Sequence, residues 1–108
     1  MLARIPASVL IVPIAEELAY RGYLLRRLVS RDFTAVSFEA SGAWPLLASA
    51  VVFGAAHGTM WPPAAIAGLA YGLLVIRTGR IGEAVCAHAA TNGLIAAAAV
   101  LGNRWELW

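Results

Sequence analysis

Long apolar runs alternate with short polar breaks along this chain, and proline, glycine or arginine residues stand at the breaks. Proline fits the first turn of a helix, where its missing N–H is not needed, so Pro45 and Pro62 mark helix starts. Asp32–Gly42 is the only extended hydrophilic stretch, and Thr78–Arg80 is a short turn. The pattern predicts four helices: from about Ile5 to Ser30, loosened by Pro6 and Pro13, from Trp44-Pro45 to about His57, from about Pro62 to Arg77, and from about Ile81 to Leu101.

The lengths of these helices suit a membrane. A full crossing needs about 20 residues. The first and fourth helices reach that length, and the second and third are nearer 15, which is tolerated among other helices. We therefore expect an all-α, multi-pass transmembrane bundle of about four helices, forming a single domain over residues 1–108. Only 15 residues precede the first acidic pair, so the chain is either a minimal core or an N-terminally truncated fragment of a larger fold.

Composition supports the membrane interpretation. The chain is 61% hydrophobic and 13% charged, with a mean hydropathy of +0.76, whereas an ordinary soluble domain is about 25% charged. The least favoured alternative is a soluble helical bundle, which would lack polar residues to cover its surface. The net charge of +2 and the dispersed arginines do not indicate nucleic-acid binding. The expected surroundings are a lipid bilayer.

The glycines and the single cysteine give two further structural expectations. Gly68 and Gly72 have the small-xxx-small spacing that lets two helix backbones approach closely, so we expect close packing there. Cys86 is the single cysteine, which excludes an internal disulfide. We expect it to be a small packing residue.

Three charged residues interrupt the first apolar run. Glu17 and Arg21 are four apart, so they share a helical face and can form an ion pair. Glu16 projects about 100° away and is freer to titrate and to bind water. Charged groups at membrane depth are costly unless they face a partner or a watered cavity. The alternative is a solvated amphipathic face, which the neighbouring leucines disfavour.

The two histidines lie in separate apolar runs, each with a partner four residues away. Phe53 and His57 share a face of the second helix, and His88 and Asn92 share a face of the fourth. A single histidine on an apolar face is more often a hydrogen-bonded core residue than a catalyst. Together with an acid pair, however, the two indicate an intramembrane active site, and a His/Asn pair suits anchoring water or polarising a carbonyl.

These three patterns, Glu16-Glu17-x-x-x-Arg21, Phe53-x-x-x-His57 and His88-x-x-x-Asn92, resemble the three ordered motifs of the CAAX-protease and bacteriocin-processing family, which includes the type II CAAX prenyl endopeptidases. The resemblance covers about Val12 to Leu94. It implies an intramembrane endopeptidase acting on a membrane-associated protein or peptide. The first alternative is a non-catalytic scaffold or immunity factor of the same fold, and the second is a transporter fragment whose acids and histidines relay protons.

The resemblance also implies roles for the motif residues. Glu16 is the expected general base that activates water, and His57 helps to hold that water. His88 and Asn92 are expected to stabilise the oxyanion of the tetrahedral intermediate. Glu17 and Arg21 are expected to orient the first helix.

The choice between metal-free and zinc chemistry stays open in the sequence. We favour a metal-free scheme with no cofactor. If zinc is used, Glu16, His57 and His88 would be its ligands, since two histidines and one glutamate make a plausible open zinc site.

Flanking segments narrow the resemblance. The SRDF segment and the RWELW ending are similar to the subgroup associated with bacterial exosortase systems, which implies a bacterial inner membrane location and exosortase-system proteins as partners. The positive-inside rule puts the Asp32–Gly42 and Thr78–Arg80 connections in the cytoplasm and both termini outside. The arginines on the connection side are Arg26, Arg27, Arg31, Arg77 and Arg80, against Arg4 and Arg104 on the other side.

Overall fold

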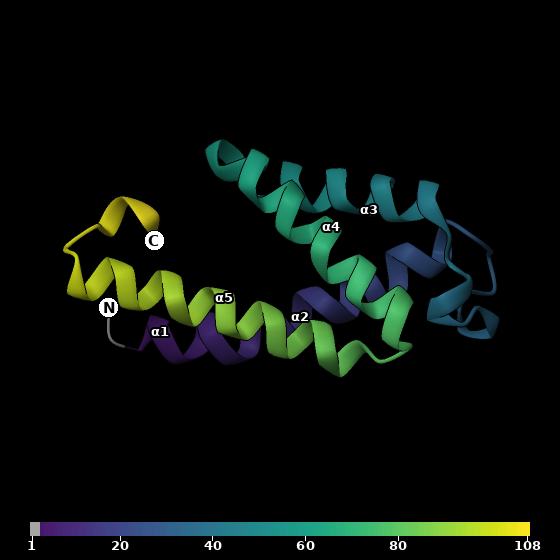
Figure 1. Cartoon of the computed structure of the whole chain (residues 1–108), viewed down its shortest axis with the longest axis horizontal. Helices are drawn as coiled ribbons and strands as arrows, with labels where there is room; N and C mark the ends of the chain where they lie inside the picture. The colour runs from purple at the N-terminus through teal and green to yellow at the C-terminus, as the bar shows by residue number, and fades with distance from the viewer. Residues whose placement is uncertain (1–2) are drawn as a thin grey trace.

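The computed structural model describes residues 3–108, and all regular elements in that range are helical, as predicted (Figure 1). Four segments follow one another without a break and form what we call the N-terminal helix: α1 (Arg4–Pro6), η1 (Ala7–Ile11), α2 (Val12–Glu17) and η2 (Leu18–Leu25). The other long helices are α3 (Ala43–Ala55), α4 (Trp61–Thr78) and α5 (Ile81–Leu101). Short 3₁₀ turns lie at Phe33–Ala35, Phe38–Ala40, Gly58–Met60 and Trp105–Leu107.

The N-terminal helix is loosened where the sequence predicted it. A π-helical stretch, η1, lies between Pro6 and Pro13. Pro13 has no N–H to donate to the carbonyl four residues earlier, so the regular α pattern is interrupted there. A second π-helical stretch, η2, begins directly after Glu17. The two adjacent glutamates therefore stand at the end of a short α-helical segment between two wider ones, an arrangement that often accompanies functional sites.

Helix boundaries agree with the prediction at some ends and differ at others. The turn after α4 forms as expected, because Gly79 adopts a left-handed conformation (φ 68°) and its N–H donates to the carbonyl of Val75 at 2.8 Å. The second helix ends close to the predicted position near His57. α3 stops at Ala55, and His57 lies in the reversal before Gly58, whose φ is +59°. The first helix also ends earlier than the predicted Ser30, since the residues after Arg27 form a turn.

The bundle is held together by α4. α3 packs along α4, and α5 packs against both α4 and the N-terminal helix (Figure 1). Close packing at the two glycines is confirmed: a Cβ on Gly68 would lie 2.8 Å from Phe53 Cδ1, and one on Gly72 would lie 2.5 Å from Leu46 Cδ1. The expected packing role of Cys86 was wrong, because its side chain is exposed on α5. The core cluster comprises Phe53, Tyr71, Val75 and Ala84.

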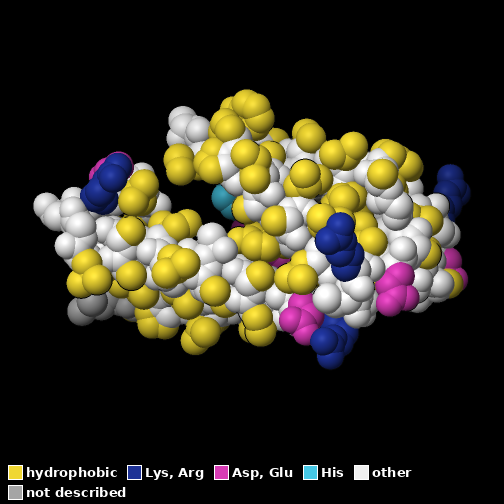
Figure 2. Space-filling model, viewed as in Figure 1, with side chains coloured by type: hydrophobic (Ala, Val, Ile, Leu, Met, Phe, Trp, Pro, Cys, Tyr) yellow, Lys and Arg dark blue, Asp and Glu magenta, His cyan; other side chains and the backbone are white. Residues whose placement is uncertain are grey.

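The surface of the bundle is apolar. Figure 2 shows hydrophobic side chains over most of one face, with charged groups at its left end and scattered over its right half. Among residues 3–108, two helical spans are long and apolar enough to cross a membrane, Gly58–Thr78 and Ile81–Leu101. The fourth helix thus matches its predicted length, and the third is longer than predicted. α3 is apolar but short, and the N-terminal helix is not among the candidate spans, since it is irregular and carries the site's charges.

Candidate active site

A buried ion pair anchors the site to the N-terminal helix. Arg21 Nη1 lies 3.1 Å from Glu17 Oε1, and the two side chains are 1% and 0% exposed. Arg21 Nη2 donates a second hydrogen bond, of 2.7 Å, to the carbonyl of Gly68 on α4. The i, i+4 pair expected from the sequence is therefore present, and the guanidinium fork also joins two helices. A lysine could not make both contacts, because it has no planar fork of donors.

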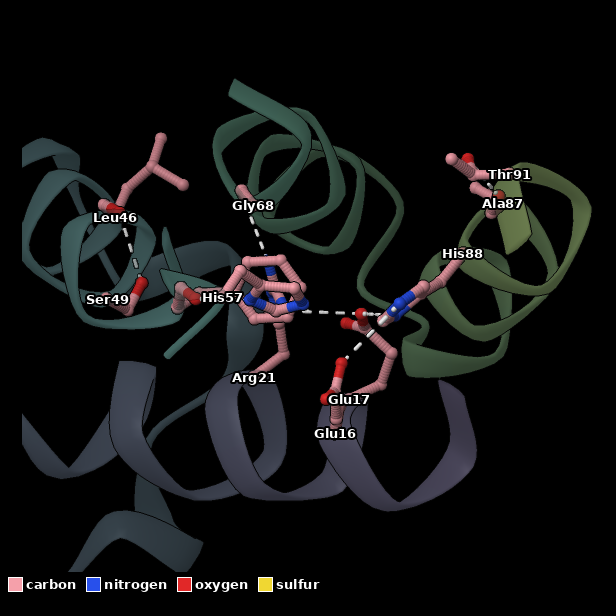
Figure 3. A network of polar contacts seen from close by, with 11 residues as sticks. Glu16, Glu17, Arg21, Leu46, Ser49, His57, Gly68, Ala87, His88 and Thr91 are labelled. Atoms are coloured by element: carbon pink, nitrogen blue, oxygen red, sulfur yellow. Dashed lines mark hydrogen bonds and ion pairs between the residues drawn. The ribbon is translucent and has the colours of Figure 1, made fainter. Parts of the chain in front are cut away.

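His88 bridges the two adjacent glutamates from α5 (Figure 3). Its Nδ1 lies 2.8 Å from Glu17 Oε1, and its Nε2 lies 3.5 Å from Glu16 Oε2. The His88 side chain is 4% exposed, whereas Glu16 is 29% exposed. The environments of the two acids differ as the helical spacing predicted: Glu17 is enclosed and doubly partnered, and Glu16 is open on one side.

The hydrogen bonds define where protons sit. Glu17 accepts from the Arg21 guanidinium, which is always charged, so Nδ1 of His88 must carry the hydrogen that it shares with Glu17. The Nε2 atom of His88 then faces Glu16. His88 and Glu16 share one further proton. When that proton is on His88, the two carboxylates and the two cations balance. A balanced set is needed at this depth, since an unpaired buried charge is costly.

Two carboxylate oxygens and one guanidinium nitrogen in this network lack hydrogen-bond partners: Glu16 Oε2, Glu17 Oε2 and Arg21 Nε are buried and unpaired. An unsatisfied buried polar atom costs about 1–3 kcal/mol. Native proteins retain few such groups, and those that remain often have a catalytic role. The network is therefore not arranged for stability alone.

Aromatic rings enclose the Arg21 guanidinium. The guanidinium carbon lies 4.6 Å from the Phe53 ring centre, 5.5 Å from that of Tyr71 and 6.0 Å from that of Tyr20. A desolvated cation over aromatic faces is stabilised by about 2 kcal/mol or more. Sequence reasoning missed Tyr71 and Tyr20 as site residues. The available signal for Tyr71 was its place beside Gly72, within the stretch predicted to pack closely.

His57 reaches the site from the turn after α3. Its Nδ1 lies 2.7 Å from the carbonyl of Phe53, and its ring lies 4.5 Å from the Phe53 ring centre. A carbonyl only accepts, so Nδ1 carries the hydrogen and Nε2 of the neutral ring is a free acceptor. The predicted Phe53–His57 association is thus present, although His57 lies beyond the helix end.

Asn92 is bound to the N-terminal helix. Its Nδ2 donates to the carbonyl of Ser8 at 2.8 Å. One hydrogen of the amide is used in this way and the second is available. His88 and Asn92 both face the same cavity, as their spacing suggested, but their hydrogen bonds go to different partners.

A cavity of about 410 Å³ adjoins these side chains. His57, His88 and Asn92 contribute its polar wall, and a histidine is visible in the hollow of the face drawn in Figure 2. Met60, Pro63 and Ile95 are among its apolar walls. Neither glutamate is among the wall residues, but Glu16 is 29% exposed and lies 3.5 Å from Nε2 of His88, which is one of them.

The three ligands expected for a zinc ion do not form a metal site in the described part of the chain. No group of three or more His, Cys, Asp or Glu side chains there is placed to hold a metal ion. His88 uses Nδ1 for Glu17, and His57 uses Nδ1 for a backbone carbonyl. These hydrogen bonds orient each ring and keep its Nε2 free, the usual arrangement of a metal-binding histidine, whereas the side chains as placed do not enclose a metal ion.

Ionisable residues inside an apolar helical bundle mark functional sites in membrane proteins. The apolar helical fold and the buried charged residues within it together indicate a membrane protein with a functional site among its helices. A family model described as type II CAAX prenyl endopeptidase Rce1-like matches residues 1–94, and the chain belongs to this family of proteases. With two helices of crossing length, it is a membrane protein. No curated protein and no solved structure matches the chain significantly.

Proposed function

We propose that this protein is an intramembrane endopeptidase that hydrolyses a peptide bond of a membrane-associated protein, using water activated by Glu16 with His57 and His88. The observation that carries the proposal is the bridging position of His88 between Glu16 and Glu17. This bridge makes one carboxylate structural and leaves the other free to accept a proton. Membership of a protease family supports hydrolysis as the reaction.

The proposed reaction begins with Glu16 ionised and His88 carrying the shared proton. Glu16 takes a proton from a water molecule that also donates to the free Nε2 of His57, and the water oxygen attacks the carbonyl carbon of the scissile bond. Electrons of the C=O bond move to its oxygen, which accepts hydrogen bonds from the second Asn92 N–H and from Nε2–H of His88. The C–N bond then breaks as Glu16 returns its proton to the leaving nitrogen. The products are a new carboxyl group and a new amine, and Glu16 is again ionised.

Two supporting residues keep this arrangement in place. Arg21 donates to Glu17, and Glu17 fixes the Nδ1 side of His88. The apolar part of the cavity wall suits an apolar segment of the substrate. A substrate within or beside the bilayer supplies such a segment.

We further propose a multi-pass protein of a bacterial inner membrane, with the Asp32–Gly42 connection in the cytoplasm. The arginine excess near that connection supports this orientation. The narrower association with exosortase-system proteins stays a prediction from the SRDF and RWELW segments.

The test is proteolysis in detergent or liposomes against a library of membrane peptides, with and without a chelator. Wild type is compared with Glu16→Ala and His57→Ala, and with Asp32→Ala, an exposed acid that is not part of the cavity wall, as the control. The proposal is supported if both site variants lose cleavage and if neither the control substitution nor the chelator affects it. Cleavage that stops with chelator and returns with zinc would keep the enzyme and overturn the metal-free mechanism. Absence of cleavage by folded wild type would favour a scaffold.

A further inference from the structure

Tyr71 is stacked on the histidine that bridges the two acids. Its ring lies 4.8 Å from the His88 ring, centre to centre, and the two planes differ by only 18°. Tyr71 comes from α4 and His88 from α5, and both side chains are buried. Phe53, by contrast, meets His88 with its edge, at 5.7 Å and 80°. Tyr71 therefore covers a face of the imidazole.

The same tyrosine also contacts Arg21. The guanidinium carbon lies 5.5 Å from the Tyr71 ring centre. Tyr71 thus touches both side chains that donate hydrogen bonds to Glu17. It belongs to none of the three sequence motifs, yet it joins the motif on the N-terminal helix to the motif on α5.

Tyr71 and Thr91 are both part of the cavity wall. The Thr91 hydroxyl donates to the Ala87 carbonyl at 2.9 Å, so Thr91 is held on its own helix. The contact between Tyr71 and His88 is made by their two stacked ring faces.

We infer that Tyr71 is a positioning residue that fixes the plane of the His88 imidazole. Rotation about the bond joining imidazole to Cβ has a broad profile, so a single hydrogen bond to Glu17 does not by itself hold the ring plane. Stacking against Tyr71 restricts that rotation, which keeps Nδ1 on Glu17 and Nε2 toward Glu16. The effect on catalysis rests on the proposed function, whereas the effect on the imidazole does not.

The structural arm of the test uses nuclear magnetic resonance of protein carrying ¹⁵N-labelled histidine in micelles. The chain has two histidines, so a His57→Gln variant assigns the signals of His88. Wild type and Tyr71→Phe should show a slowly exchanging, downfield Nδ1–H proton of His88, because the ring face is retained. Tyr71→Leu should lose or average that signal. Retention of the wild-type signal in folded Tyr71→Leu would overturn the inference.

The kinetic arm uses a peptide that wild type cleaves. Tyr71→Leu should lower kcat by about 10- to 100-fold, the effect expected from a small misplacement of a reacting group, with KM changed less than about twofold. Tyr71→Phe should restore kcat to near wild type. Tyr71→Met, also without an aromatic face, runs in parallel in case the leucine variant does not fold. Tyr23→Leu is the matched control, because its aromatic partner is Phe33 outside the site.

The spectroscopic and kinetic experiments together distinguish a failure of the Tyr71 inference from a failure of the proposed function. Equal kcat in wild type and the folded leucine or methionine variant would overturn the inference. A loss in Tyr71→Phe as large as that in Tyr71→Leu would also overturn it, since the hydroxyl rather than the ring face would then matter. If wild type cleaves no peptide, the proposed function fails, and the Nδ1–H signal alone decides the role of Tyr71.

Discussion

His88 donates its Nδ1 hydrogen to Glu17 across 2.8 Å, although 71 residues separate the two in the chain. This contact joins the N-terminal helix to α5 through two buried side chains. It also determines the direction of the opposite imidazole nitrogen, which lies 3.5 Å from Glu16. One acid of the adjacent pair is therefore part of the framework, and the other is placed to exchange a proton.

Removal of Arg21 should destabilise the protein strongly. Arg21→Met leaves Glu17 buried without its cation, and breaking a buried pair in this way costs about 3–5 kcal/mol. Glu17→Gln added to Arg21→Met should recover part of the loss, because the buried charge is then absent. Thermal denaturation in micelles measures both effects. Arg77→Met, at an exposed arginine of α4, is the control, and a loss in Arg21→Met no greater than in this control would contradict the account.

Gly68 should not tolerate a methyl group. A Cβ there would lie 2.8 Å from Phe53 Cδ1 and 3.2 Å from Arg21 Nη2, and Phe53 is itself buried. Gly68→Ala should therefore cost about 1–3 kcal/mol, as overpacking usually does, and should reduce cleavage by moving Arg21.

The matched control is Gly82→Ala on α5, where a Cβ meets nothing within 4 Å. Alanine is favoured over glycine in a helix by about 0.5–1 kcal/mol, so this variant should be unchanged or slightly more stable in the same denaturation assay. Equal behaviour of the two alanine variants would argue against close packing of α3 on α4.

Asn92 should matter for turnover more than for substrate binding. Loss of one oxyanion donor typically lowers kcat by about 10²–10³-fold, and we expect this for Asn92→Ala with little change in KM. Asn92→Asp should be at least as severe, because a carboxylate would face the Ser8 carbonyl and repel the oxyanion. Steady-state kinetics on a cleaved peptide measures this. Asn103→Asp, in an exposed turn, is the control, and unchanged kcat in Asn92→Ala would remove Asn92 from the mechanism.

Helix positions could be predicted where local residues decide them. The fourth helix, Ile81–Leu101, agrees with the prediction because Gly79 ends the preceding helix through its own left-handed conformation. The Glu17–Arg21 pair was also predictable, since helical spacing alone places the two side chains together. α3 ends at Ala55, close to the predicted end near His57, and Gly58 with its positive φ marks the reversal that follows.

Contacts between helices could not be read from the sequence. The stacking of Tyr71 on His88 and the bond from Asn92 to Ser8 depend on how α4, α5 and the N-terminal helix pack, and no spacing within one helix encodes that. Cys86 shows the same limit. Cys86 lies two residues before His88 and was expected to pack as a small residue on another face of the helix, but that face of α5 is exposed.

The most direct test of the account is cleavage in water enriched in ¹⁸O, with wild type and Glu16→Gln compared on one membrane peptide and the products weighed by mass spectrometry. Wild type should place one ¹⁸O atom in the new carboxyl group. Glu16→Gln, nearly isosteric but unable to accept the proton, should slow cleavage by about 10²–10⁴-fold while its melting temperature stays near that of wild type. Cleavage by Glu16→Gln at the wild-type rate would contradict the central role of Glu16.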